Sequence, residues 1–176
     1  MVLLALWTAL EAPATSRSAL LLLPPTSAVA SLRPEVVEAA LAEALRSQAV
    51  ITLRTLEPAQ RAALQADPGC ALDRACLAAL AGPDVDALLR GSVQVHNGLL
   101  SLDLALLDPT GALTRRVAFP ITAATPAQIA PSLPALLLPL DLDAADYARA
   151  VAGDKAAAAR LRARSPDSPW ARALPP

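Results

Sequence analysis

The sequence predicts a single α/β (α+β) domain, with a mixed sheet of about five strands, a C-terminal antiparallel meander and helices packed on the sheet. Strand-like and helix-like segments alternate over residues 18–81, as they do in parallel β-α-β units. An Asn-Gly dipeptide then separates two long runs of alternating hydrophobicity, which is the pattern of a β-hairpin. The chain has 176 residues, enough for one domain but not for two complete cores.

The composition excludes several classes of protein. The chain is 55% hydrophobic, far too apolar for a wholly disordered protein. No run approaches the roughly 20 apolar residues that a membrane-spanning helix needs, so we expect no transmembrane span. The formal net charge is -1 and aromatic residues make up 2% of the chain. Neither value indicates a nucleic-acid partner, which requires a concentrated positive face or aromatic stacking platforms.

The amino terminus resembles an export signal. Residues 2–10 are apolar, and the small residues Ala12 and Ala14 follow at A-x-A positions. This pattern predicts a signal-peptide-like leader over residues 1–14, cleaved near Ala14, and hence a periplasmic or secreted protein. The basic region that normally comes first is missing, so the alternative is an apolar leader on a cytoplasmic protein, or a start placed too far downstream. No cysteine lies near the expected cleavage site to serve as a lipid acceptor.

The first half of the domain alternates strands and helices. Residues 18–23 (SALLLL) and 49–53 (AVITL) are short apolar segments, typical of buried strands. Between them, residues 33–47 place a proline in the first turn and carry one apolar stripe, as an amphipathic helix does. Residues 57–66 and 71–81 predict two further helices. We expect all three helices to pack on one face of the sheet.

The two cysteines, Cys70 and Cys76, lie around the start of the third helix. Residues six apart on a continuous helix are about 9 Å apart by rise alone, too far for a disulfide. The turn sequence at residues 67–69 (DPG) lets the chain fold back before the helix begins, so we predict a structural Cys70–Cys76 disulfide. Two buried free thiols are the alternative. A zinc site is disfavoured, because His96 is the one other strong ligand.

The hairpin is the clearest local feature of the sequence. Residues 86–96 and 99–108 flank Asn97-Gly98, the dipeptide suited to a two-residue type I′ turn. The turn sets the strand pairing: His96 opposite Leu99, Val95 opposite Leu100, Gln94 opposite Ser101, Val93 opposite Leu102 and Ser92 opposite Asp103.

This pairing separates the hairpin into two faces. The apolar face carries Val93, Val95, Leu100, Leu102, Leu104 and Leu106. The polar face carries Arg90, Ser92, Gln94, Ser101 and Asp103, with Arg90 diagonal to Asp103.

A third strand and a helical region complete the chain. In the strand over residues 112–122, Arg115 shares the parity of the apolar Leu113, so the strand is either bulged there or lies at the sheet edge. Residues 126–140 contain three prolines and predict a broken or shortened helix. The α/β domain thus spans residues 18–140. An alanine-rich C-terminal helix over 141–164 and a disordered tail over 165–176 follow.

No residue pattern indicates catalysis. The chain lacks glycine-rich phosphate loops, the G-x-S-x-G nucleophile elbow and the H-E-x-x-H zinc helix. The single histidine, His96, is expected in solvent beside the hairpin turn. Residues 141–146 (DLDAAD) resemble the start of a calcium loop without its central Gly and terminal Glu, and Asp84 and Asp86 suit a turn or strand entry. We predict no catalytic residue, no cofactor and no metal.

Two other functions stay open. An enzyme of unrecognised type would need Arg90, Asp103 and His96 to converge in a deep pocket. A cytoplasmic regulatory protein would use the Arg-rich C-terminal segment over residues 160–164 to contact an anionic surface. The same arginines equally suit a solvated helix end, because they lie at the negative end of the helix dipole.

Residues 70–117 resemble a known type of envelope domain. A Cys-containing helix leads to a hairpin of the form ALLRGSV…G-LSL-L-LLD-TG. With the earlier strand and helix, this looks like the amino-terminal α/β domain of exported proteins from myxobacteria and related bacteria. That domain is similar in layout to the amino-terminal domain of the Tol-system propeller protein TolB, and to the curli-secretion lipoprotein CsgG and its transpeptidase-activator relatives. The resemblance covers residues 18–140.

This resemblance implies a non-catalytic envelope module that binds other proteins through its sheet or helix faces. The chain departs from the pattern in lacking the lipid-acceptor cysteine and the propeller, PEGA or transmembrane segment that often follows. These departures put membrane attachment by those routes in doubt. The predicted function is an exported protein-binding or assembly module, periplasmic or envelope-associated, whose partners are envelope proteins.

Overall fold

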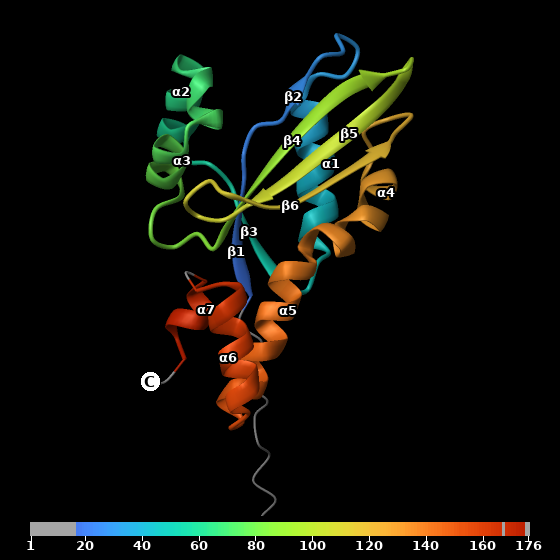
Figure 1. Cartoon of the computed structure of the whole chain (residues 1–176). Coiled ribbons are helices and arrows are strands. Elements are labelled where there is room, and N and C mark those ends of the chain that lie inside the picture. Colours follow the sequence, from blue (N-terminus) through green and yellow to red (C-terminus); the bar gives the residue numbers. More distant parts are fainter. Residues whose placement is uncertain (1–16, 167, 175–176) are drawn as a thin grey trace, which may run out of the picture.

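In the computed structural model, a six-stranded mixed sheet runs through the centre of the molecule (Figure 1). The structure describes residues 17–166 and 168–174, and the expected leader lies outside them. The main strands are β1 (Ser18–Leu22), β3 (Ile51–Arg54), β4 (Ala87–His96), β5 (Leu99–Leu107) and β6 (Leu113–Pro120). Their order in the sheet is β3-β1-β4-β5-β6, and the two-residue strand β2 (Thr26–Ser27) pairs with β4 beyond the end of β1. The predicted fold class is confirmed.

The sheet has a parallel half and an antiparallel half. Strand β1 lies parallel to both β3 and β4, whereas β4, β5 and β6 form the antiparallel meander. The pairing of β4 with β5 matches the predicted register, from His96 opposite Leu99 to Ser92 opposite Asp103. Asn97 has a φ of 51° and Gly98 a φ of 78°, the left-handed conformation that a type I′ turn requires at both positions.

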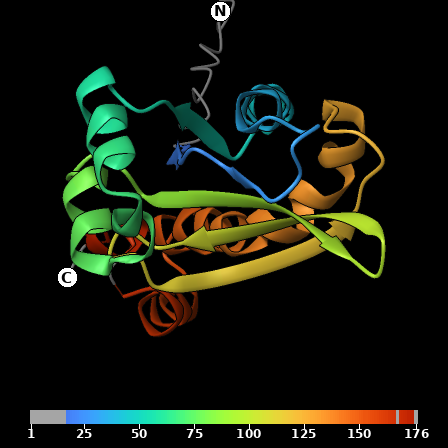
Figure 2. The same ribbon diagram turned by 90° about the horizontal axis from the view of Figure 1, so that it is seen from above.

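Helices cover both faces of the sheet, so the expectation of helices on one face was wrong. The first face carries α1 (Pro34–Arg46), α4 (Pro126–Ile129) and α5 (Leu133–Val151); the second carries α2 (Pro58–Ala66), the 3-10 helix η1 (Pro68–Leu72) and α3 (Arg74–Ala81). Figures 1 and 2 show α1 and α4 on the opposite side of the molecule from α2 and α3.

The apolar run of β1 explains this double cover. Leu20 and Leu22 pack into the core under α1, while Leu21 and Leu23 pack into the second core under α3. Neighbouring side chains on a strand point to opposite faces. The unbroken leucine run Leu20–Leu23 therefore needs a layer of helices on each side.

Strand β6 combines the two features considered for Arg115. The pairing of β5 with β6 shifts between Leu106, which faces Arg115, and Leu107, which faces Leu113. Thr114 is therefore the extra residue of a bulge. Strand β6 is also the last strand of the sheet, and Arg115 is exposed there.

The C-terminal region contains separate helices in place of the one helix expected over 141–164. The proline-rich segment forms α4, the 3-10 helix η2 (Ala130–Ser132) and the start of α5, which continues to Val151 with Pro139 inside it. Helix α6 (Lys155–Arg164) begins after Gly153, whose φ is 102°. Asp154 caps α6 by accepting the N–H groups of its first turn. The left-handed glycine and the capping carboxylate end one helix and start the next despite the alanine-rich sequence.

The expected disordered tail over 165–176 is also corrected for the residues that the structure describes. Residues 169–172 form the short helix α7 (Pro169–Arg172). Trp170 is only 7% exposed; its ring centroid lies 5.0 Å from that of Tyr147, and its Nε1–H donates to Ser18 Oγ at 3.3 Å. Burial of this large aromatic ring, together with Ala171 and Leu174, anchors the segment. Over the described residues, no helix is both long and apolar enough to cross a bilayer.

Candidate protein-binding face

The polar face of the β4–β5–β6 meander is only partly covered. Helix α3 and η1 pack over one end of it, above Ala105 and Leu107. Farther along, Ser92 and Ser101 are half-buried and Gln94 is exposed. Where the covered and open parts meet, a groove of about 600 Å³ runs between the η1–α3 wall and the strands. We call this groove the sheet groove.

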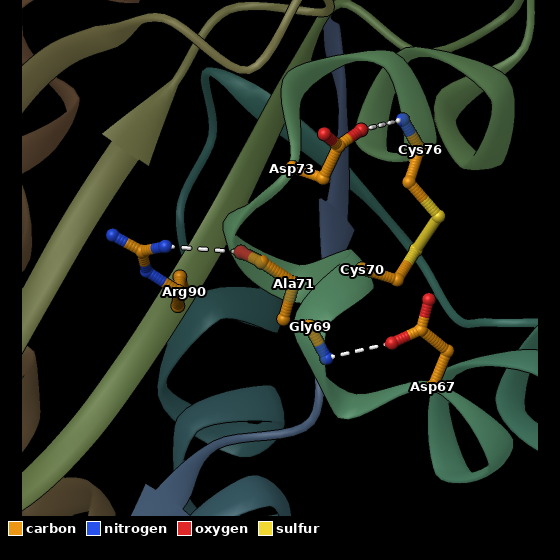
Figure 3. The surroundings of a disulfide bond; sticks show 7 residues. All are labelled: Asp67, Gly69, Cys70, Ala71, Asp73, Cys76 and Arg90. Atoms are coloured by element: carbon orange, nitrogen blue, oxygen red, sulfur yellow. Dashed lines mark hydrogen bonds between the residues drawn. A yellow bond between two sulfur atoms is a disulfide. The ribbon is translucent and has the colours of Figure 1, made fainter.

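Four charged side chains line the sheet groove: Arg74, Arg90, Asp103 and Arg116. On β6, Arg116 Nε donates to Asp103 Oδ1 of β5 at 2.8 Å, and its Nη2 donates to Oδ2. This contact raises the pKa of the Arg116 guanidinium. On β4, Arg90 donates Nη1–H to the Ala71 carbonyl at 3.0 Å, which ties the sheet to η1 (Figure 3).

The partner of Asp103 thus differs from the expected diagonal neighbour Arg90, because β6 brings Arg116 closer. Neither Arg74 nor Arg90 forms an ion pair with any residue in the described part of the chain. Sequence reasoning singled out neither Arg74 nor Arg116. The sequence did contain a signal for Arg116. Successive side chains on a strand point to opposite faces of the sheet, so Arg116, next to the apolar Val117, belongs on the polar face.

Two leucines stand at the margins of the sheet groove. Leu72 at the end of η1 is 75% exposed, and Leu113 at the start of β6 is 59% exposed. Side chains of this size usually lose most of their contact with water on folding, because burial is favourable by about 25 cal/mol per Å². Their exposure places two apolar side chains in solvent beside the groove.

The Cys70–Cys76 disulfide braces the η1–α3 wall (Figure 3). Cys70 lies in η1 and Cys76 in α3, and their Cα atoms are 5.3 Å apart, well within disulfide reach. Asp73 caps α3 by accepting the Cys76 N–H at 2.8 Å, and Asp67 accepts the Gly69 N–H at 3.0 Å. The wall is therefore held by one covalent bond and two capping carboxylates.

Reduction of this disulfide is expected to lower stability modestly. The loop it closes is much shorter than the roughly 15 residues for which about 3 kcal/mol is predicted, so the loss of unfolding free energy falls below that figure. Urea unfolding with and without reductant measures the loss. The double variant Cys70→Ala, Cys76→Ala should show no response to reductant. A wild-type midpoint that stays unchanged after complete reduction would contradict the bracing role.

The residues considered for an enzyme do not converge. Arg90 and Asp103 line the sheet groove, but His96 lies exposed at the hairpin turn, opposite Leu99. Asp84 is exposed before β4. Within the described ranges, no group of His, Cys, Asp or Glu is arranged to hold a metal ion.

Asp86 stands at the entry to β4, as the sequence predicted. Its Oδ2 accepts the Ala19 N–H at 2.7 Å and so joins β4 to β1. Burial raises the pKa of the Asp86 carboxyl, against the opposing effect of this hydrogen bond. This contact gives Asp86 a structural role between two parallel strands.

The C-terminal acids and arginines form ion pairs between α5 and α6. Asp143 and Asp146 are both buried. Arg164 donates to Asp143 Oδ1 at 2.7 Å and to Asp146 Oδ2 at 3.0 Å, and Arg160 donates to Asp146 Oδ1 at 3.0 Å. Residues 141–146 are thus helical and do not start a calcium loop. Arg160 and Arg164 are exposed at their side chains, and both are held in ion pairs with buried acids of α5.

These ion pairs predict a loss of stability in acid. Hydrogen bonds from Arg160, and then from Arg164, hold the pKa of Asp146 below its usual value against the opposing effect of desolvation. An unfolded Asp has a pKa of about 3.9, so as the pH falls the unfolded chain binds a proton at this residue before the folded protein does. The contribution of Asp146 to the free energy of unfolding is therefore complete above that pH and is lost as the pH falls toward the lower pKa of the folded state. Urea unfolding at successive pH values should show a shallower acid loss for Asp146→Asn than for wild type.

Asp141→Asn, at an exposed position on the same helix, is the matched control and should keep the wild-type acid profile. An unchanged acid loss in Asp146→Asn would contradict the contribution of this ion-pair network.

Comparison with protein-family models gives no match, and comparison with curated proteins gives none either. Among solved structures, the chain is similar to the LpoB C-terminal domain from Escherichia coli (18% identity, 63% of this chain and 87% of that chain, TM-score 0.47). It is also similar to the PelC dodecamer from Paraburkholderia phytofirmans (15% identity, 72% of this chain and 89% of that chain, TM-score 0.42). A further similar structure is lipoprotein GNA1162 from Neisseria meningitidis (17% identity, 59% of this chain and 79% of that chain, TM-score 0.39). At these scores the likeness is partial and assigns neither activity nor partner to this chain.

Proposed function

We propose that this chain is a non-catalytic, exported module of the cell envelope that binds another protein through the sheet groove. The observation that carries the proposal is the uncovered polar face of the meander beside a braced wall. On the opposite face, Leu102 and Leu104 are fully buried, so the strands under the sheet groove are fixed by core packing. A rigid concave surface with exposed leucines at its margins suits a protein partner.

Export is supported by two features of the chain. A disulfide between Cys70 and Cys76 persists in oxidising compartments and is rare in the cytosol. The apolar stretch followed by Ala12 and Ala14 suits a leader cleaved near Ala14. The sequence resemblance implies a module of the same type as the TolB amino-terminal domain and the CsgG-like envelope domains. After cleavage of the leader, the mature protein would be periplasmic or secreted.

Site-specific photocrosslinking in the native cells tests the proposal. A photoreactive p-benzoylphenylalanine in place of Gln94, exposed in the sheet groove, should give a light-dependent adduct with one envelope protein. The same residue in place of Glu43, exposed on α1 across the sheet, is the control and should give none. Co-expression of excess wild-type protein, which lacks the photoreactive residue, should suppress the Gln94 adduct. Equal adducts at both positions, or none at Gln94, would contradict the proposal.

A further inference from the structure

We infer that the sheet groove takes an extended acidic segment of the partner, with carboxylates paired to Arg74 and Arg90 and an apolar side chain against Leu72 and Leu113. This inference rests on the proposed function and adds to it the chemistry of the partner.

The first argument for an acidic ligand is the charge of the residues that line the sheet groove. Asp103 and Arg116 neutralise each other, which leaves Arg74 and Arg90 as two positive charges without an acidic partner among the described residues. The whole chain has a formal net charge of -1, so this positive potential is local. Guanidinium groups pair with carboxylates through two parallel hydrogen bonds, the strongest type of charged hydrogen bond. An acidic ligand is therefore favoured over a basic or neutral one.

Arg90 is already oriented for such a ligand. Its half-buried side chain is fixed by the hydrogen bond from Nη1 to the Ala71 carbonyl. A guanidinium has five N–H donors, so donors beyond this one are available to a ligand. Because the side chain is held before binding, less rotamer entropy is lost when a carboxylate arrives.

The floor of the sheet groove favours an extended segment. The floor is formed by residues of β2, β4, β5 and β6. Neighbouring strands lie about 4.8 Å apart, so these four strands together span roughly 14 Å. About four residues of extended chain, at roughly 3.3 Å each, cover that distance. The lining contains no aromatic residue, so the stacking on which single-stranded nucleic acids rely is missing there.

Fluorescence anisotropy with labelled peptides tests this inference on the whole protein. The probes are a nonapeptide with alternating aspartate and leucine at its centre, and the same peptide with lysine in place of each aspartate. The acidic peptide should bind at least ten-fold more tightly than the basic one. Its affinity should fall about five-fold or more in Arg74→Ser and in Arg90→Gln, and it should weaken as salt is added, since exposed charges are screened.

Arg33→Ser, at an exposed position just before α1, is the matched control and should leave the affinity unchanged. Equal binding of the two peptides, or equal losses in Arg33→Ser and Arg74→Ser, would overturn the inference. Binding of a labelled thymidine oligonucleotide as tightly as the acidic peptide would assign the groove to nucleic acid and overturn it as well.

The photocrosslink at Gln94 separates failure of this inference from failure of the proposed function. A Gln94 adduct with no preference for the acidic peptide would overturn the inferred chemistry and leave the protein-binding function supported. A preference for the acidic peptide with no adduct in the envelope would support the groove chemistry and overturn the proposed function.

Discussion

Replacing Leu102 with aspartate is expected to unfold the domain. Leu102 lies at the centre of β5, paired with Val93 on one side and Phe119 on the other, and it is fully buried. A carboxylate there would have neither water nor a charged partner. We expect a loss of at least about 4 kcal/mol, comparable with the whole stability of a marginal domain. Thermal unfolding followed by circular dichroism should show no cooperative transition, and Val93→Asp should behave alike.

The matched control lies on the same hairpin. Leu99 is 66% exposed, so Leu99→Asp should stay within about 0.5 kcal/mol of wild type. A full cooperative transition in Leu102→Asp would contradict the packing of the meander against α1.

Replacing Trp170 with alanine is expected to produce the second largest loss. The indole packs against Tyr147 in α5 and donates a hydrogen bond to Ser18 at the start of β1. Truncation of a buried aromatic side chain costs about 3 kcal/mol or more. Urea unfolding of the whole protein measures this cost.

Trp170→Phe separates the two contributions. It keeps most of the ring contact and removes the hydrogen bond, so its cost should be about 1 kcal/mol. If Trp170→Ala has the stability of wild type, residues 169–172 do not dock on the domain, and the earlier expectation of a disordered tail would be correct.

The local parts of the fold could be predicted because their signals lie within a few residues of each other. Asn97-Gly98 specifies the turn, and the alternation in the flanking strands specifies the same register. Helices on both faces of the sheet could also have been predicted, because the unbroken apolar run Leu20–Leu23 is typical of a strand buried on both faces. The composition of α2 and α3 alone does not say which face they cover.

The missed features depend on contacts that local patterns cannot reveal. Trp170 is ordered through Ser18, 152 positions earlier in the chain. The ion pair of Asp103 with Arg116 depends on how β6 is aligned with β5, and the bulge at Thr114, two residues before Arg116, shifts that alignment. The sheet groove exists because α3 and η1 stop partway along the meander. Its charge could be counted from the sequence only after these elements had been placed.

The proposed envelope partner depends on export, and export in turn is supported by the Cys70–Cys76 disulfide. Intact mass spectrometry of the protein isolated from its native cells, with free thiols blocked at lysis, tests export most directly. We predict a chain that begins near residue 15 and carries no alkylated cysteine. A chain that retains residues 1–14 with both Cys70 and Cys76 alkylated would contradict the exported location and the function built on it.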